Sequence, residues 1–230
     1  MSAGTTRNAD DLAVVLLAAG ASRRFGTDNK LLAPIGGTPL VATVARTVRA
    51  ALPNATITAV LRADTGANNG SPADAHLRAD DVRAVLTDIV DAFCINPDAD
   101  RGLGSSVACG IAAVAEADPT GAMVVQGDMP GLTHRLLVGL VAAFHENGTG
   151  LIVVPVDTTG TWRTPVIWPS HTFADLTTLT GDRGGRALME RDPGAVCAVP
   201  FSEGDAFVDI DTVDDLARWQ ASTAVSKRQG

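Results

Sequence analysis

The sequence predicts an α/β protein in which a mostly parallel sheet lies between two layers of helices. Short apolar runs alternate along the chain with segments of roughly 10–15 residues that have helical patterns, as expected for strands joined by crossover helices. The first apolar run, Leu12–Leu17, has no polar face. Such a run is typical of a central strand that is covered on both sides. Together these observations predict a three-layer α/β/α fold.

Each element in the first half of the chain has a local signal. Thr38 and Pro39 are typical of the cap and the first turn of a helix. Apolar residues recur with helical spacing from Val82 to Val90. Glycine, asparagine, alanine and aspartate dominate Asp64–Asp80, where we expect an exposed loop. The expected elements are a strand at Leu12–Leu17, a helix from Thr38 to about Ala51, a strand at Thr56–Leu61, a helix that includes Val82–Val90 and a strand at Ala92–Ile95.

The same alternation continues in the second half. A glycine turn precedes an apolar helix at Ser105–Ala117, and Thr133 predicts the cap of a helix that ends at Glu146. Thr212, followed three residues later by Asp215, is typical of a reciprocal cap on a helix that continues through Trp219. Two further strands are expected, at Ala122–Gln126 and Leu151–Val156.

Composition restricts the domain organisation and the partners. The 230 residues suit one large domain, which we expect at 12–220 with flexible tails at 1–11 and 221–230. The net charge of −8 argues against nonspecific binding to nucleic acid or to an anionic membrane. The apolar run Leu12–Ala21 is about half the roughly 20 residues that a spanning helix needs. It also lacks the flanks of a signal peptide, so we expect a cytoplasmic protein.

The cysteines and histidines suggest no metal site or disulfide framework. Cys94, Cys109 and Cys197 are far apart and form no C-x-x-C pair. We expect buried thiols in a reducing compartment. The four histidines lack ligand spacing and are expected at the surface, and the three tryptophans are expected in the core or in pocket walls.

The segment Leu16–Lys30 is the clearest candidate binding site. It has the sequence LLAAGASRRFGTDNK, in which a buried strand leads into a loop of small residues with three positive charges. Small side chains let backbone N–H groups approach an anion, and the cations neutralise a polyphosphate. The alternative is that Gly20 and Gly26 are ordinary turn residues. The segment has neither the P-loop nor the dinucleotide pattern, so we expect a nucleoside triphosphate bound in another arrangement.

Two other loops are expected beside this segment, because ligands of such sheets bind at the carboxyl ends of the strands. Asn96–Ser106 contains a glycine pair that permits close backbone approach, and its Ser105 or Ser106 can either cap the next helix or meet a ligand oxygen. Gly127–Gly131 follows a buried strand. The three loops together predict a binding site at one edge of the sheet.

Three aspartates are candidate metal ligands. Asp128 lies at the predicted ligand edge, and Mg²⁺ favours one or two carboxylates together with substrate phosphates. The alternative is a turn or cap aspartate. Asp209 and Asp211 are two residues apart and would face the same side of an extended segment. We expect one of them, preferably Asp211, to be the second ligand, because Asp214 and Asp215 already have a role at the start of a helix.

Five motifs occur in the order seen in the molybdenum cofactor nucleotidyltransferases, and the chain resembles that family from about Leu12 to Trp219. LAAG alone marks the wider superfamily, whereas GLGSS combined with GDRGGRAL is much more specific. The resemblance is greatest to the cytidylyltransferase branch and implies the Rossmann-like fold of nucleotide-diphospho-sugar transferases. The motifs are LAAGxSxRxG with a following lysine, GLGSSV, GDMP, GDRGGRAL and DIDTVDDL.

The resemblance implies a role for individual residues of this chain. It implies that Arg24, Lys30 and Asp128 are catalytic, and that Asp128 binds Mg²⁺ with Asp211 or Asp209. The implied nucleotide-binding residues are Leu17, Ala18, Ala19, Gly20, Ser22, Arg24, Lys30, Gly102 and Ser105. The implied acceptor-binding residues are Thr164, Arg183 and Arg186.

The activity that the resemblance implies is transfer of CMP from CTP to the terminal phosphate of molybdopterin or molybdenum cofactor, with release of pyrophosphate. Ala19 favours CTP, because the guanylyl branch has LAGG, which leaves more room beside a purine. Thr164-Pro165 stands where family members often have His-Pro or Asn-Pro, so the acceptor pocket is expected to differ. A recipient molybdoenzyme or an insertion chaperone is the implied protein partner.

Three alternatives remain open. One is a guanylyltransferase that uses GTP, and another is a superfamily enzyme with a sugar or polyol phosphate as acceptor. The third is a noncatalytic carrier of molybdenum cofactor. The paired metal carboxylates argue against a carrier, which has no need of them.

Overall fold

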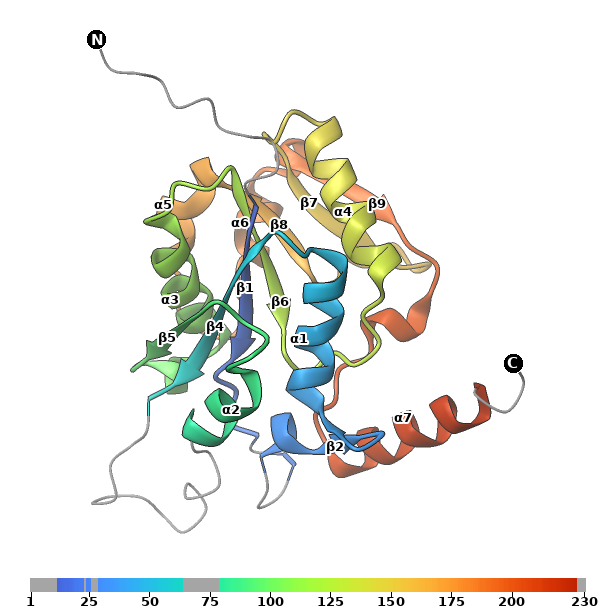
Figure 1. Ribbon diagram of the computed structural model, residues 1–230. Coiled ribbons are helices and arrows are strands. Elements are labelled where there is room, and N and C mark those ends of the chain that lie inside the picture. The colour runs from blue at the N-terminus through green and yellow to red at the C-terminus, as the bar shows by residue number, and fades with distance from the viewer. Residues whose placement is uncertain (1–11, 23, 26–28, 64–78, 227–230) are drawn as a thin grey trace.

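The computed structural model describes residues 12–22, 24–25, 29–63 and 79–226. The predicted N-terminal tail, most of the predicted loop at 64–80 and the last four residues lie outside the described residues, as do Arg23 and Gly26. Within the described part, the predicted three-layer α/β/α architecture is confirmed (Figure 1).

A seven-stranded sheet forms the middle layer. Every strand of this sheet runs in one direction except β8, which is antiparallel to both of its neighbours. The predicted mostly parallel sheet is therefore confirmed. In spatial order the strands are β5 (Ala92–Asn96), β4 (Thr56–Arg62), β1 (Leu12–Ala18), β6 (Gly121–Gln126), β8 (Val166–Pro169), β7 (Ile152–Val156) and β9 (Val196–Pro200).

Helices cover both faces of this sheet (Figure 1). One face packs against α1 (Leu40–Ala51), α2 (Ala79–Leu86) and α4 (His134–Glu146). The other packs against α3 (Leu103–Ala115), α5 (Phe173–Leu176) and α6 (Arg186–Arg191).

Strand β1 contributes to both cores, because successive side chains of a strand point to opposite faces. Val14 and Leu16 pack in the first core, and Val15 and Leu17 pack in the second. Every residue of β1 is buried, which explains the uninterrupted apolar run.

The predicted cap of α1 is wrong. Thr38 and Pro39 form the short strand β3 (Thr38–Pro39), which pairs with β2 (Pro34–Ile35) in a hairpin. The helix begins at Leu40 without a side-chain cap. The hairpin replaces the cap, because the backbone N–H of Leu40 donates to the carbonyl of Ala33 at 2.9 Å.

Other boundaries also differ from those predicted. Helix α2 begins at Ala79, inside the predicted loop, and ends at Leu86. Ile89 and Val90 follow in a turn, and both still pack in the core. Helix α3 begins two residues before Ser105, because Gly102 in the left-handed region starts it, and it ends at Ala115.

The C-terminal part agrees with the predicted caps but adds elements. Thr133 accepts the N–H of Leu136, and Thr212 and Asp215 cap each other's backbone at the start of α7 (Val213–Ser226). This helix extends past the boundary predicted at residue 220. Strands β8 and β9 and helices α5 and α6 were not predicted. None of the helices in the described part of the chain is long and apolar enough to span a membrane.

The expectation of buried cysteines is wrong. All three are half-buried. Cys94 in β5 and Cys109 in α3 lie side by side, with their Sγ atoms 3.8 Å apart.

We expect Gly110→Ala to destabilise the fold. A Cβ at Gly110 in α3 would lie 2.3 Å from Cγ1 of Val15 and 2.8 Å from Cγ2 of Val60, both fully buried. Overpacking of this kind costs about 1–3 kcal/mol. Gly139→Ala in α4 is the matched control, because a Cβ there meets nothing within 4 Å. It should stabilise the helix by about 0.5–1 kcal/mol. Chemical denaturation of the two variants measures both effects, and equal stabilities would contradict the close packing of α3.

Candidate functional site

A cavity of about 340 Å³ opens at the carboxyl ends of β1 and β6. We call it the lysine cavity. It is formed by the three loops that were predicted to lie together, and by the segments around Asp182 and Asp211. Its lining residues are Leu17, Ala19, Gly20, Ala21, Ser22, Arg24, Lys30, Leu31, Ala99, Asp100, Gly102, Leu103, Ser106, Gln126, Asp128, Asp182 and Asp211.

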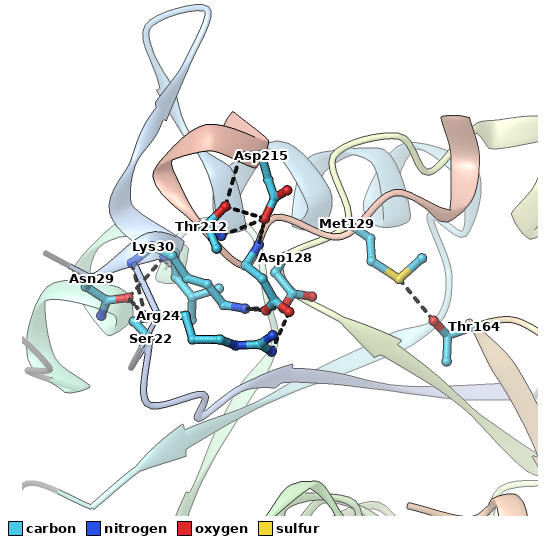
Figure 2. A network of polar contacts seen from close by, with 11 residues as sticks. Ser22, Arg24, Asn29, Lys30, Asp128, Met129, Thr164, Thr212 and Asp215 are labelled. Atoms are coloured by element: carbon cyan, nitrogen blue, oxygen red, sulfur yellow. Dashed lines mark hydrogen bonds and ion pairs between the residues drawn. The ribbon is translucent and has the colours of Figure 1, made fainter. Parts of the chain in front are cut away.

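Lys30 joins the two carboxylates of Asp128 and Asp211 in this cavity. Its Nζ donates to Oδ2 of Asp128 at 2.7 Å and to Oδ1 of Asp211 at 2.9 Å. Arg24 donates to the other oxygen of Asp211 at 2.6 Å. Figure 2 shows the side chains of Arg24 and Lys30 ending beside Asp128. The exposed fractions differ widely, at 9% for the Lys30 side chain and 73% for Arg24. Lys30 is thus a fixed cation, and Arg24 lies at the open rim.

The backbone before Lys30 is held by side chains of the same loop. Asn29 caps the short 3₁₀ helix η1 (Lys30–Leu32) by accepting the N–H of Leu31 at 3.0 Å. Oγ of Ser22 accepts the N–H of Lys30 at 3.1 Å and donates to the Asn29 side chain. Ser22 has a φ of 49°, in the left-handed region that favours glycine. Its hydroxyl therefore organises the loop (Figure 2).

Close backbone approach positions the carboxylates. Gly127, which precedes Asp128, donates to the carbonyl of Leu17 at 2.9 Å, and a Cβ on Gly127 would lie only 2.9 Å from that oxygen. The carbonyl of Asp128 in turn accepts the N–H of Ile210 at 3.0 Å. This bond brings Asp211 beside the end of β6, although the two aspartates are far apart in the sequence.

The electrostatics keep Lys30 charged. Burial opposes its charge, but the attraction and hydrogen bonds of Asp128 and Asp211 outweigh burial and raise the pKa of Lys30 above its usual value of about 10.5. At neutral pH the ammonium is therefore a permanent positive charge and not a proton acceptor.

Asp128 has the properties of a metal ligand. Its Oδ1 is buried and has no hydrogen-bond partner among the described residues. A buried carboxylate oxygen without a partner is costly, and a cation would satisfy it. The described residues contain no group of three or more histidine, cysteine, aspartate or glutamate side chains suited to a metal. Asp128 and Asp211 thus fit Mg²⁺ only as a carboxylate pair that substrate oxygens complete.

The two serines of the GLGSS motif differ in their surroundings. Ser105 is buried; its hydroxyl is 2.8 Å from the carbonyls of Asp98 and Gly102 and accepts the Asn96 amide. It holds the loop and is not among the residues that line the cavity. Ser106 also accepts the Asn96 amide, at 3.0 Å, and does line the cavity. The predicted helix cap is wrong for both serines, because α3 begins at Leu103 after Gly102 and has no side-chain cap.

A second cavity, of about 280 Å³, adjoins the first and shares Leu17, Leu103 and Gln126 with it. We call it the tryptophan cavity, because Trp162 and Trp168 form part of its wall. Its other lining residues are Val107, Val124, Met129, Arg163, Thr164, Val166, Arg183, Gly184, Gly185, Arg186, Met189, Phe207 and Asp209.

All three residues predicted to bind the acceptor lie in the tryptophan cavity. Thr164 donates its hydroxyl to the sulfur of Met129 at 3.1 Å (Figure 2). Arg183 and Arg186 both bind Glu190, at 2.8 Å and 3.0 Å. One glutamate therefore orients two arginines at the rim of this cavity.

Asp209 also lies in the tryptophan cavity, so the expectation that Asp209 and Asp211 face the same side is wrong. The segment is not a strand, and the fully buried Ile210 anchors it between the two carboxylates. Burial raises the pKa of Asp209, and the nearby charges of Asp211 and Asp128 raise it further.

Most of the predicted nucleotide-binding residues line the lysine cavity. Two of them do not line it. Ser105 is one, and Ala18 is the other, because Ala18 packs in the core on the other face of the sheet. Those that line it are Leu17, Ala19, Gly20, Ser22, Arg24, Lys30 and Gly102.

Arg163 was missed by the sequence analysis. It lines the tryptophan cavity and is bound by Asp157 at 2.7 Å. The Asp157 carboxylate also accepts the N–H groups of Thr159 and Thr161. The DTTGT turn, an aspartate followed by small polar residues just before a Trp-Arg pair, was the available signal.

The loops of the two cavities are joined through their backbones. The N–H of Gly104 donates to the carbonyl of Gly181 at 2.7 Å, and the N–H of Gly181 donates to the carbonyl of Arg101 at 2.9 Å. A Cβ on Gly102 would lie 2.3 Å from Oδ1 of Asp182 and 2.6 Å from the carbonyl carbon of Gly181. Only glycine permits this approach, so the GLGSS and GDRGGRAL motifs meet here.

Comparison with known proteins agrees with this architecture. A crystal structure of the homologue of Mycobacterium tuberculosis Rv0371c from Mycobacterium sp. strain JC1 superposes with a TM-score of 0.73 at 29% identity, covering 94% of this chain and 98% of that one. Rv0371c from M. tuberculosis H37Rv, solved as a complex with manganese, has the same fold, with a TM-score of 0.67 at 22% identity over 92% of this chain and 99% of that one.

A curated relative is the bifunctional protein GlmU of Leifsonia xyli subsp. xyli, which is 33% identical over 146 residues. The match covers 63% of this chain but only 27% of GlmU, so the chain spans about a quarter of that relative's length. The profile of the MobA-like NTP transferase domain matches residues 14–196. The match spans most of the chain, and it includes most of β1, Lys30, Asp128 and the loops of both cavities that precede β9. The chain therefore belongs to the family of MobA-like NTP transferase domains.

Proposed function

We propose that the protein is a Mg²⁺-dependent cytidylyltransferase that transfers CMP from CTP to the terminal phosphate of molybdopterin or molybdenum cofactor. The observation that carries this proposal is the pair of adjoining cavities. One combines a fixed ammonium and an arginine at the rim with a carboxylate pair, and the other combines aromatic walls with three arginines. Such an arrangement suits a triphosphate beside a flat, anionic acceptor.

The proposed reaction is an in-line displacement. An oxygen of the acceptor phosphate attacks the α-phosphorus of CTP, and the bond to the departing pyrophosphate breaks. Chemistry of this kind depends on positioning and charge stabilisation more than on a protein nucleophile. In our proposal the acceptor enters from the tryptophan cavity, and the α-phosphate lies near the wall that Leu17, Leu103 and Gln126 share between the cavities.

The chain's own residues supply the charges. Lys30 places a permanent ammonium beside the phosphates, where its position is set before the substrate arrives. Arg24 at the exposed rim binds the outer phosphates. Asp128 and Asp211 would hold Mg²⁺, which neutralises the phosphate charge when bound. The manganese complex of Rv0371c supports a divalent cation in this fold.

The tryptophan cavity supports the choice of acceptor. Trp162 and Trp168 offer apolar surface to a flat ring, and Arg163, Arg183 and Arg186 offer charge to a phosphate. We propose that Thr164, Arg183 and Arg186 contact the acceptor, and that Arg163 does so as well.

Pyrophosphate release tests the proposal. Purified protein is assayed with CTP or GTP and Mg²⁺, with and without molybdenum cofactor, and with a sugar phosphate and methylerythritol phosphate as alternative acceptors. We expect release only with CTP and molybdenum cofactor together. Release with GTP, or with another acceptor, would transfer the assignment to the corresponding alternative, and no release with any combination would indicate a noncatalytic carrier.

Asp128→Asn should abolish Mg²⁺ binding and the turnover that depends on it. The substitution keeps the shape of the side chain but removes the negative charge of the carboxylate to which the buried Oδ1 belongs. We expect turnover to fall at least about 100-fold, as for loss of other transition-state charge stabilisation, and the heat of Mg²⁺ binding in the presence of nucleotide to disappear. Asp175→Asn, at an exposed ion pair with Arg191, is the control. Retained metal binding in Asp128→Asn would exclude Asp128 as a ligand.

In Lys30→Met, the effect of the ammonium on turnover can be measured separately from its effect on the stability of the fold. It keeps the apolar stem and removes the ammonium, so we expect turnover to fall about 10²–10³-fold. Thermal unfolding, measured in parallel, reports the cost of leaving Asp128 and Asp211 without their cation. Arg135→Met, which breaks the exposed pair with Glu203, should leave turnover unchanged. A normal rate in Lys30→Met would contradict its role at the phosphates.

Ala19→Gly should weaken the preference for CTP. Ala19 is buried in the wall of the lysine cavity, and loss of its methyl group leaves more room beside the base. One methyl group changes discrimination by about tenfold. The measurement is the ratio of kcat/KM for CTP and GTP, with Ala18→Gly as control, because Ala18 faces the opposite core. An unchanged ratio would remove Ala19 from base selection.

A further inference from the structure

Cys94 and Cys109 form a dithiol pair at the edge of the sheet. Cys94 lies in β5, the edge strand of the described sheet, and Cys109 lies in α3, which packs on it. The two Sγ atoms are 3.8 Å apart, and Sγ of Cys109 also lies 3.5 Å from the carbonyl of Ile95. Both residues are half-buried, so a small reagent can reach them.

The two thiols differ in their pKa values. The hydrogen bond between the two sulfurs lowers the pKa of Cys109 to about 7. The same interaction, together with burial, raises the pKa of Cys94 well above its usual value. Cys109 is therefore the thiol of the pair that loses its proton first, and the thiolate is the nucleophilic form. Cys94 keeps its proton until its partner has reacted.

We propose that Cys94 and Cys109 are a redox-active modification site that a peroxide converts to a reversible disulfide. This site is independent of the proposed transferase function. The two Sγ atoms, now 3.8 Å apart, need to approach by about 1.8 Å to reach the S–S bond length of about 2.0 Å.

The chemistry is balanced with hydrogen peroxide as the oxidant. The Cys109 thiolate attacks one peroxide oxygen, the O–O bond breaks, and the departing hydroxide takes up a proton to give water. Cys109 is now a sulfenic acid. The sulfur of Cys94 then attacks the sulfur of Cys109, an S–S bond forms, and the sulfenic oxygen leaves as a second water with the proton of Cys94. Two thiols and one peroxide thus give one disulfide and two waters.

The disulfide would add a covalent bond next to the lysine cavity. Cys109 lies about one helical turn after Ser106, which lines that cavity. Asn96, two residues after Cys94, already holds Ser105 and Ser106 through its amide at 3.0 Å. Oxidation would therefore fix the end of β5 to the first turns of α3 more firmly than these hydrogen bonds do.

Peptide mapping tests the site. Full-length protein is treated with hydrogen peroxide, the remaining thiols are alkylated, and the protein is digested with trypsin. Arg101 lies between the two cysteines, so their peptides separate unless a disulfide joins them. We expect the joined peptide in the wild type and in Cys197→Ser, and its loss after treatment with a phosphine reductant. In Cys94→Ala, Cys109 should instead advance to sulfinic acid, because no second thiol resolves it.

Two outcomes would overturn the proposal. One is oxidation of the cysteines without a joined peptide, and the other is a disulfide between chains through Cys197. Hydrogen exchange of reduced and oxidised protein tests the link to the cavity separately, since it needs no nucleotide. We expect the amides of Leu103–Cys109 to exchange several-fold more slowly after oxidation. Equal exchange would overturn the link to the cavity.

Discussion

The ammonium of Lys30 is the interaction on which the arrangement of the site depends. It attracts two carboxylates from segments that are far apart in the sequence, and without it Asp128 and Asp211 would repel each other in a half-buried position. Burial opposes its charge, and the two carboxylates outweigh this effect and raise the pKa of Lys30. The positions of Lys30, Asp128 and Asp211 therefore depend on one another. The loop that Ser22 and Asn29 organise holds the Lys30 side chain in place.

The second cavity depends on how closely the backbone packs. Gly127 lies against the carbonyl of Leu17, and Gly185 against the ring of Trp168, where a Cβ would come within 2.4 Å. These contacts bring the ends of the strands and the 180–186 segment close enough for Leu17, Leu103 and Gln126 to serve both cavities. The two cavities are therefore adjacent and are separated by a wall that both share.

The sequence predicted the parts of the molecule that local patterns specify. The apolar run of β1, the cap at Thr133 and the reciprocal cap at Thr212 each have a local cause, and all are confirmed. Strand β8 was missed, because only tertiary pairing determines its antiparallel direction. The ion pairs of Lys30 and the approach of Cys94 to Cys109 could not be predicted either, since spacing in the chain says nothing about contacts across a helix and a sheet.

The backbone bonds between Gly104 and Gly181 have a consequence for how relatives of this protein can diverge. The two segments, each of which lines both cavities, are bonded directly through their backbones with no side chain in between. Insertions or bulky replacements in either loop would force the other to move, so the two loops must change together or not at all. Grafting only one of them from a relative with a different acceptor should therefore give a misfitted hybrid, whereas exchanging both as a unit preserves the junction between them.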